Sequence, residues 1–381
     1  MTHKPTKWRW HPRSVSEARN AVLAARTMPL HPRSASATKG AFLQARVPWQ
    51  QCVRIVCLLV MLVASLSARA AELNGPLPQP LPLFPLDNWW NQEVTWAPVD
   101  ANSDWFIQYI NTPDTKRLHP SLGGDVCPGC VETYGIPYIT VEWWQPRVAV
   151  NFYYASESDG VDHFTGQSYP FYPIPDEAIW QAHWVQGGWP GRIDRRDDND
   201  RHIIVVDRDN NYLYELWNTY FDLGTWQWFA GGGAFFDMKT NDRRPEGWTS
   251  AIASGMAMLP GLVRYDEVYG DGEIEHALIV STRTTNGYVY PASHRSGWSE
   301  GALPLGARLR LKSWTDISYF PPDCQKIFRA MKRYGLIVTD AGVDMMIGGS
   351  YDPRWNNDIM NPCFHGLTAW NFEVLQLGWR P

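Results

Sequence analysis

The sequence lacks the features that would assign it to several common classes of protein. No apolar run reaches the roughly 18 residues that a membrane-spanning helix needs. No heptad pattern and no fixed-period repeat runs through the chain, which excludes coiled coils and repeat solenoids. The His-Glu-x-x-His motif of zinc proteases is also absent.

Cysteine is scarce, with six residues in a chain of 381, and two of them, Cys52 and Cys57, lie in the predicted signal peptide described below. In an oxidising compartment the other four can pair in three ways. The close spacing of Cys127 and Cys130 also suits a redox pair or half of a zinc site. However, they lie in a Gly-rich loop, and no second close pair follows. We predict two disulfides, Cys127–Cys130 and Cys324–Cys363.

An export signal begins late in the chain. Basic residues flank the apolar run 55–66, and Ala68-Arg-Ala70 supplies the small residues that a signal peptidase recognises. We predict a signal peptide over residues 47–70 and a secreted or periplasmic protein. Residues 1–46 are then a disordered extension, or they precede a true translation start near Val47. A cytoplasmic tail on a membrane-anchored protein is the alternative.

Charge is distributed unevenly along the chain. Residues 1–70 hold 11 Lys and Arg against one acid, so the remainder carries 23 basic and 38 acidic residues. A protein this acidic is poorly suited to nucleic acid or to anionic membrane surfaces. We therefore expect no nucleic-acid partner, and no stable membrane span after signal cleavage. A proline-rich arm at 71–86 leads into one predicted domain over 87–381.

The residue pattern after this arm favours β structure. Only two stretches, 103–110 and 322–334, have helical spacing, and residues 208–211 separate two apolar runs as a hairpin turn does. The sequence predicts a mainly β domain, a β-sandwich or jelly roll with a few short helices. The expected strands are 138–144 paired with 148–154, 202–207, 212–217, 261–265, 273–281, 287–291, 307–311 and 336–339.

The sequence contains no run with the spacing of a metal site. Asp207-Arg-Asp-Asn-Asn211 is similar to the first half of a calcium loop, but its sixth position is Tyr212 and its twelfth is Asn218. A hairpin tip is the better interpretation. Seven histidines follow residue 70 without forming a His-x-His pair. We predict no metal and no cofactor.

The most suggestive run of acidic residues lies between Arg264 and His276. On a strand, side chains alternate between two faces, so Asp271, Glu273 and Glu275 would share one face. Cα atoms two positions apart on a strand would be about 7 Å apart, a spacing from which carboxylates reach the separation used in glycoside hydrolysis. Crowding of like charges would also raise the pKa of one carboxyl, giving an acid beside a base. A solvated strand face is the alternative.

Tryptophan is abundant, and of 21 residues only three precede Ala70. The flat indole suits stacking on sugar rings as well as core packing. Together with the acidic run, this favours a carbohydrate-active enzyme that hydrolyses glycosidic bonds of a polysaccharide. The main alternative is a non-catalytic protein that binds glycans or the cell wall, and a structural surface protein is a third possibility.

The candidate site residues follow from these patterns. Glu273 and Asp266 are the acid and base candidates. His202 and His276 stand in apolar runs, where a histidine is either hydrogen-bonded within the core or, if the two strands are neighbours, assists catalysis. The substrate-binding candidates are Arg264, Asp352 and two stacking residues, Trp248 and Trp355.

Seven longer motifs run through the chain: Asp87–Asn91, Tyr134–Tyr138, Asp200–Asp207, Gly247–Ala251, Pro260–Glu267, Gly272–Leu278 and Asp352–Trp355. Together they resemble a family of secreted bacterial and fungal proteins that brings no known activity, and the resemblance covers nearly all of residues 84–375. In the pattern of that family the positions of Glu273 and His276 are fixed and that of Glu275 varies. This implies that a third carboxylate is not required. The Cys127-Pro-Gly-Cys130 insertion departs from the pattern and fits a local disulfide.

Overall fold

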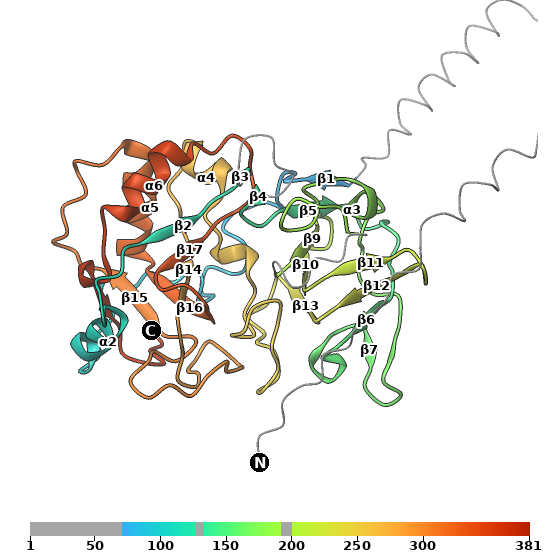
Figure 1. The fold of residues 1–381 in the computed structure, drawn as a ribbon, viewed down its shortest axis with the longest axis horizontal. Coiled ribbons are helices and arrows are strands. Elements are labelled where there is room, and N and C mark those ends of the chain that lie inside the picture. The colour runs from blue at the N-terminus through green and yellow to red at the C-terminus, as the bar shows by residue number, and fades with distance from the viewer. Residues whose placement is uncertain (1–70, 126–132, 192–199) are drawn as a thin grey trace, which may run out of the picture. The chain divides into compact units, whose positions relative to one another are not determined.

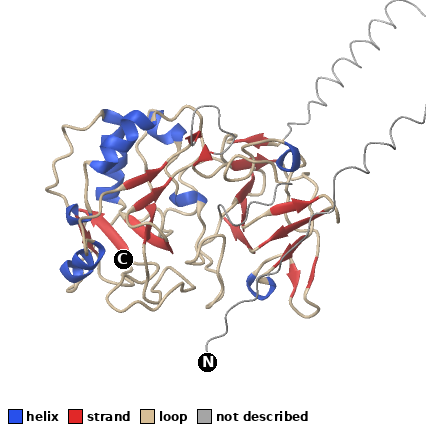
Figure 2. Ribbon diagram, viewed as in Figure 1, coloured by secondary structure: helices blue, strands red, loops and turns tan. Residues whose placement is uncertain are grey.

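Strands outnumber helices in the described part of the chain (Figures 1 and 2). The computed structural model describes residues 71–125, 133–191 and 200–381, which all fall within one structural unit. The helices are few and short, so the predicted mainly β class is confirmed.

A five-stranded mixed sheet contains β1 (Glu72–Leu73), β5 (Tyr138–Val141), β9 (Ile203–Asp207), β10 (Tyr212–Trp217) and β13 (Gly232–Asp237), in the order β1-β5-β9-β10-β13. Strands β9 and β10 form the predicted hairpin, in which Asp207 pairs with Tyr212. Asn211 adopts a φ of 55° in the turn. Asparagine enters this left-handed region more readily than most residues, which explains why the Asp-Asn-Asn sequence turns here.

A three-stranded sheet contains β6 (Val150–Phe152), β11 (Tyr220–Asp222) and β12 (Gln227–Ala230), in the order β11-β12-β6. The predicted pairing of 138–144 with 148–154 is therefore wrong, because β5 and β6 belong to different sheets. All four residues of β5 are buried, and the strand lies in the sheet interior beside β9. The chain turns away after it, where the Gln145 N–H donates to the Glu142 carbonyl.

A six-stranded sheet contains β2 (His119–Ser121), β14 (Leu278–Thr282), β15 (Arg308–Leu311), β16 (Leu336–Ala341), β17 (Met346–Gly348) and β18 (Phe372–Val374), in the order β18-β15-β16-β14-β17-β2. β14 and β16 are parallel. The strands predicted at 307–311 and 336–339 match β15 and β16. The strand predicted at 273–281 is confirmed only in its second half.

The remaining elements are short. Two-stranded ladders join β3 (Gly124–Asp125) with β4 (Thr133–Tyr134), and β7 (Val161–Asp162) with β8 (Gln167–Ser168). The other helical turns are α3 (Glu177–Trp180), η1 (Ala155–Glu157), η2 (Leu259–Gly261) and η3 (Ala369–Asn371). Neither of the strands predicted at 261–265 and 287–291 forms.

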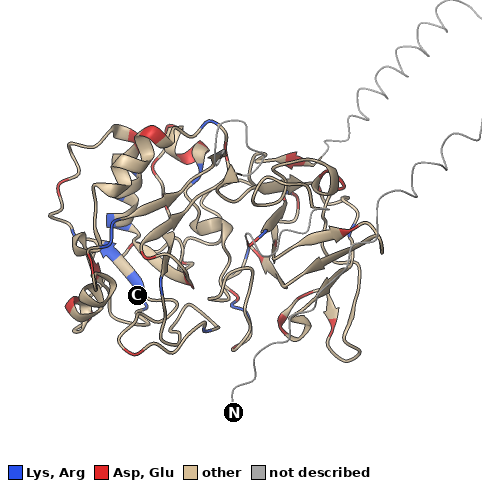
Figure 3. Ribbon diagram, viewed as in Figure 1, with Lys and Arg blue, Asp and Glu red and all other residues tan. Residues whose placement is uncertain are grey.

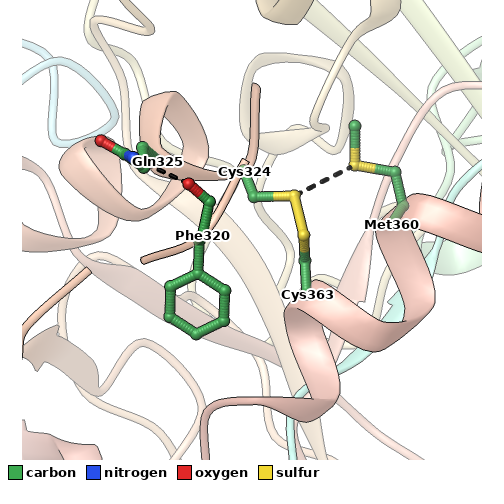
Figure 4. Close-up of a disulfide and its surroundings, with 5 residues drawn as sticks. All are labelled: Phe320, Cys324, Gln325, Met360 and Cys363. Carbon is green, nitrogen blue, oxygen red and sulfur yellow. Dashed lines mark hydrogen bonds between the residues drawn. A yellow bond between two sulfur atoms is a disulfide. The ribbon is translucent and has the colours of Figure 1, made fainter. Parts of the chain in front are cut away.

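Two predicted helices are confirmed, α2 (Ser103–Ile110) and α5 (Pro322–Arg333), whereas α6 (Asn357–His365) was not predicted. The predicted disulfide between Cys324 of α5 and Cys363 of α6 is present, and both residues are buried (Figure 4). It closes a loop with a sequence separation of 39 residues. Cys127 and Cys130 lie outside the described residues.

The five-stranded sheet is buried on both faces. Ile204 and Val206 of β9 belong to a core cluster shared with the six-stranded sheet, α5 and α6. Ile203 and Val205 point the other way, into a second cluster shared with the three-stranded sheet. This alternation follows from the two-residue period of a strand, and it explains why β9 is apolar at nearly every position.

Candidate functional site

The run from Arg264 to His276 forms a short helix and a loop, so the predicted strand is wrong. Helix α4 spans Tyr265–Tyr269, and residues 270–277 contain neither helix nor strand. The Arg264 guanidinium contacts the carboxylate of Glu267, a neighbour three residues on that a helical turn brings to the same side. This ion pair favours a helix here, and the expected alternation of carboxylates over two strand faces does not occur.

Arg264, Glu267 and His276 form a buried polar network. Arg264 is 1% exposed, and its Nη2 lies 2.6 Å from Oε1 of Glu267. Nε2 of His276 lies 3.0 Å from the same oxygen, and its Nδ1 lies 2.9 Å from the Ala277 carbonyl oxygen. Burial opposes ionisation of Glu267, but the charges of Arg264 and His276 outweigh it and lower the pKa of this carboxyl. The network is therefore a buried ion cluster within the fold.

The two acid and base candidates, Glu273 and Asp266, are both paired with arginine. Arg329 of α5 holds Glu273 with two hydrogen bonds of 3.0 Å and 2.8 Å. These bonds lower the pKa of Glu273, whereas a general acid needs a raised one. Oδ1 of Asp266 accepts a bond of 3.2 Å from Arg264. Both carboxylates thus have structural partners, and their catalytic role stays a prediction.

The substrate-binding candidates Asp352 and Trp355 are largely buried. Arg354 donates to both oxygens of Asp352, at 2.9 Å and 2.6 Å. The Trp355 indole is 6% exposed and packs against Tyr265, with its N–H donating to the Ser350 carbonyl. A ring packed in this way cannot stack on a sugar, so the structure gives no support to this role for Trp355.

Trp248 and His202 both lie next to a backbone segment, 249–253, that lines a cavity. The Trp248 ring is half-buried beneath the Arg244 guanidinium. His202 is buried, and its Nε2 lies 2.8 Å from the Ala251 carbonyl oxygen. Burial lowers the pKa of His202, which keeps the ring neutral near pH 7. His202 therefore supports the cavity wall from behind and shares no contact with His276.

The cavity that these residues support has a volume of about 520 Å³. None of the residues 264–276 lines it, and its size suits a small ligand or a short segment of a polymer. Apart from segment 249–253, its lining comes from three loops and the ends of β10 and β16. Its charged and aromatic side chains are Tyr154, Glu157, Asp200, Trp217, His294, Arg295 and Asp340.

Tyr154 and Trp217 form an aromatic wall of the cavity. Their rings are stacked with centroids 6.3 Å apart and an angle of 29° between the planes. The Trp217 indole N–H donates to Oδ1 of Asp200 at 3.2 Å, which fixes the ring next to a carboxylate. Gly231 packs against this ring, and a Cβ at that position would collide with the indole. Aromatic rings presented beside polar groups are the common means of binding sugars.

Asp340 lines the cavity and has a strongly shifted pKa. It follows the buried run Leu336–Thr339 at the carboxyl end of β16. Burial raises the pKa of Asp340 to about 6, and the nearby charge of Asp200 adds to the increase. The backbone N–H groups of Ala341 and Ala253 oppose this shift without cancelling it. Asp340 is therefore a carboxyl that keeps its proton in weakly acidic solution, as a general acid does.

The backbone of one residue, Ala253, links Asp340 to His294. The Ala253 N–H faces Asp340, and the Ala253 carbonyl oxygen lies 2.8 Å from Nδ1 of His294. Because a carbonyl only accepts, we assign the hydrogen of the neutral ring to Nδ1, which leaves Nε2 as an acceptor. Below about pH 6 the cavity thus holds a protonated carboxyl, and beside it a histidine nitrogen that can accept a hydrogen bond.

The wall segment 249–253 is fixed from several sides. The Ser250 hydroxyl donates to the Met256 carbonyl at 2.6 Å, and the Thr249 N–H donates to the Glu157 carboxylate at 3.2 Å. The Ser254 N–H donates to the Thr339 carbonyl at 3.0 Å, which ties the segment to β16 next to Asp340. These bonds hold the backbone around the cavity in one arrangement, as a preorganised site requires.

The residues that converge on the cavity were not predicted as site residues. Asp340 carried one usable signal, a carboxylate directly after a buried apolar strand. Asp200 lies in the motif that holds His202, and His294 follows a Pro-Ala-Ser run. No spacing rule connects them, because they are far apart in sequence and only the fold brings them together.

Comparison of the chain with protein-family models, with curated proteins and with solved structures gives no match. Across residues 71–125, 133–191 and 200–381, no helix combines the length and apolar character needed to cross a bilayer. In the same residues no group of three or more His, Cys, Asp or Glu is arranged to hold a metal ion.

Proposed function

We propose that the protein is a secreted or periplasmic carbohydrate-active enzyme that hydrolyses glycosidic bonds of a polysaccharide. The observation that carries this proposal is the pair formed by Asp340, with a pKa raised to about 6, and the nearby Asp200. Glycoside hydrolysis uses two carboxyl groups whose surroundings separate their pKa values, one acting as the acid.

In this proposal Asp340 donates its proton to the glycosidic oxygen as the bond to the anomeric carbon breaks. Asp200 supplies the second carboxylate. It either takes the proton of the attacking water or bonds to the anomeric carbon until water displaces it. In both cases the hydroxyl of water ends on the anomeric carbon and the leaving sugar receives the proton of Asp340. His294 Nε2 is placed to accept a hydrogen bond from a sugar hydroxyl.

The remaining lining of the cavity supports a glycan ligand. Trp217 and Tyr154 offer a stacking face next to the acid pair. Glu157, Asp200 and Asp340 outnumber the single guanidinium of Arg295, which itself lies 4.2 Å from the Trp298 ring centroid. Because like charges repel, this lining favours neutral or amino sugars over polymers of uronic acid.

The test is a product screen on a panel of polysaccharides, with release of reducing ends as the readout. Asp340→Asn and Asp200→Asn should each lower turnover by a factor of about 100 or more. Glu273→Gln is the matched control, since its carboxylate is paired with Arg329 outside the cavity, and it should retain wild-type turnover. Full activity of Asp340→Asn, or the absence of any cleaved glycan, would contradict the proposal.

A non-catalytic glycan-binding protein is the second candidate, and surface tryptophans favour it. Trp96, Trp314 and Trp298 are 94%, 73% and 69% exposed, which offers indole faces outside the cavity. Such a protein would bind insoluble polysaccharide without cleaving it, and its Asp340→Asn variant would bind as well as the wild type. Loss of binding in Trp217→Ala, without turnover in the wild type, would select this candidate.

Two predictions from the sequence belong with this proposal. Export through residues 47–70 requires a mature protein that begins at Ala71, which N-terminal sequencing of the exported protein measures. A mature chain that still contains residues 47–70 would contradict it. The β-sandwich or jelly-roll arrangement of the sheets stays a prediction, and an experimental structure tests it.

A further inference from the structure

Strand β15 carries two arginines with opposite surroundings (blue in Figure 3). Arg310 pairs with Glu373, whose Oε1 lies 2.6 Å from its Nη2. Arg308 has no such partner, since among the described residues no carboxylate lies within ion-pair distance of it. Its guanidinium donates to the Trp89 carbonyl oxygen. Two cations on one strand are thus compensated differently.

Arg308 is also half-buried. Burial lowers the pKa of Arg308 to about 10, a direction that reflects a charge without a nearby anion. Charged groups taken out of water are normally paired, because desolvating an unpaired charge is unfavourable. One carbonyl contact satisfies a single N–H of the five that a guanidinium carries. The remaining positive potential lies beside a cavity.

That cavity is small, and among the described residues no acidic side chain lines it. It has a volume of about 20 Å³, and Arg308, Trp89, Tyr290 and Gln376 contribute to its lining. A volume of this size holds one species about as large as a water molecule. The Trp89 indole N–H is buried and has no acceptor among the described residues. The Arg380 guanidinium lies 3.8 Å from the Tyr290 ring centroid and adds a second positive charge nearby.

We propose that this cavity binds a small monovalent anion of the size of chloride, held by the Arg308 guanidinium. The lining offers hydrogen-bond donors and positive charge, which select an anion over a cation. Its volume excludes oxyanions as large as sulfate. The cavity shares no lining residue with the one around Asp340, so the anion site stands independently of the proposed hydrolase activity.

The first test measures the unfolding temperature of the purified protein at constant ionic strength, in sodium chloride and in sodium gluconate. Gluconate is too large for the cavity. Chloride should raise the unfolding temperature by about 2–4 °C, because a ligand that binds only the folded state stabilises it. Arg308→Gln should remove this difference, and Arg310→Gln, the matched control on the same strand, should keep it. Equal unfolding temperatures in both salts, or an unchanged difference in Arg308→Gln, would overturn the proposal.

The second test does not depend on a variant that folds. Crystals of the wild-type protein grown with bromide, which replaces chloride and scatters anomalously, should show an anomalous peak beside the Arg308 guanidinium. Bromide peaks confined to the protein surface would overturn the proposal. Trp89→Phe, which removes the indole N–H donor together with part of the ring, should reduce the occupancy of the bromide peak.

Discussion

Two charged clusters of this protein differ in how their charges are compensated. Around Arg264, each carboxylate meets a cation, and Glu267 is held by both Arg264 and His276. Around Asp340, the carboxylates of the cavity accept hydrogen bonds from N–H groups, and within the described residues none forms an ion pair. The first cluster is saturated and holds the fold together. The carboxylates of the second cluster stay free of ion pairs with the described residues, and they are scattered along the sequence.

The strongest test of this comparison removes the centre of the saturated cluster. Glu267→Gln leaves Arg264 buried without its anion, and breaking a buried pair in this way costs about 3–5 kcal/mol. Urea denaturation measures the loss. Asp200→Asn, which removes a carboxylate from the other cluster, should change the free energy of unfolding by less than about 0.5 kcal/mol. Similar losses in the two variants would erase the distinction.

A second prediction concerns stability and Asp340. Its pKa in the folded protein is raised from 3.8 to about 6, so the stability it contributes is fully present below pH 3.8 and is lost as the pH rises through 6. The side-chain amide that Asp340→Asn introduces cannot ionise. Between pH 4 and pH 8 the variant should gain about 2–3 kcal/mol relative to the wild type, measured by denaturation at both pH values. Parallel stability curves would mean that Asp340 titrates normally.

The pH dependence of turnover sharpens the same point. If Asp340 is the general acid, kcat/KM on a cleaved glycan should fall about tenfold for each pH unit above 6, as the carboxyl loses its proton. Glu273→Gln should leave this profile in place. A rate that rises between pH 6 and pH 8 would assign the acid to another group.

The smallest effect is expected at the edge of the saturated cluster. Glu273 and Arg329 form an ion pair whose side chains are 48% and 44% exposed. Solvent-exposed pairs contribute about 0.2–1 kcal/mol, so Glu273→Gln should lower stability by no more than about 1 kcal/mol. A double-mutant cycle with Arg329→Gln measures the pair itself. A coupling energy well above this value would show that Glu273 has a larger structural role.

The sequence predicted elements that depend on near neighbours. The β9–β10 hairpin follows from its turn residues, and α2 and α5 follow from their apolar spacing and flanking residues. The pairing predicted for β5 is wrong, because long-range packing decides which strand lies beside it. The prediction also failed at 264–276, where side-chain ion pairs favour a helix over a strand.

The candidate site shows the same limit. Glu273 and Asp266 were predicted as site residues because acidic residues are dense in that run. In the fold, however, each of them pairs with an arginine. Asp340 stands alone in its sequence environment, and its raised pKa comes from burial and from Asp200, which a linear pattern does not reveal. His202 was noticed correctly as an unusual buried histidine, but it contacts the wall backbone at Ala251.

Gly231 constrains how the aromatic wall can evolve. A Cβ at position 231 would collide with the Trp217 indole, so any other residue there would force the ring to move. Tyr154, at 43% exposure, carries no comparable restriction. Position 231 is therefore closed to substitution as long as Trp217 is kept, and a library that tests the proposed glycan binding should begin at Tyr154.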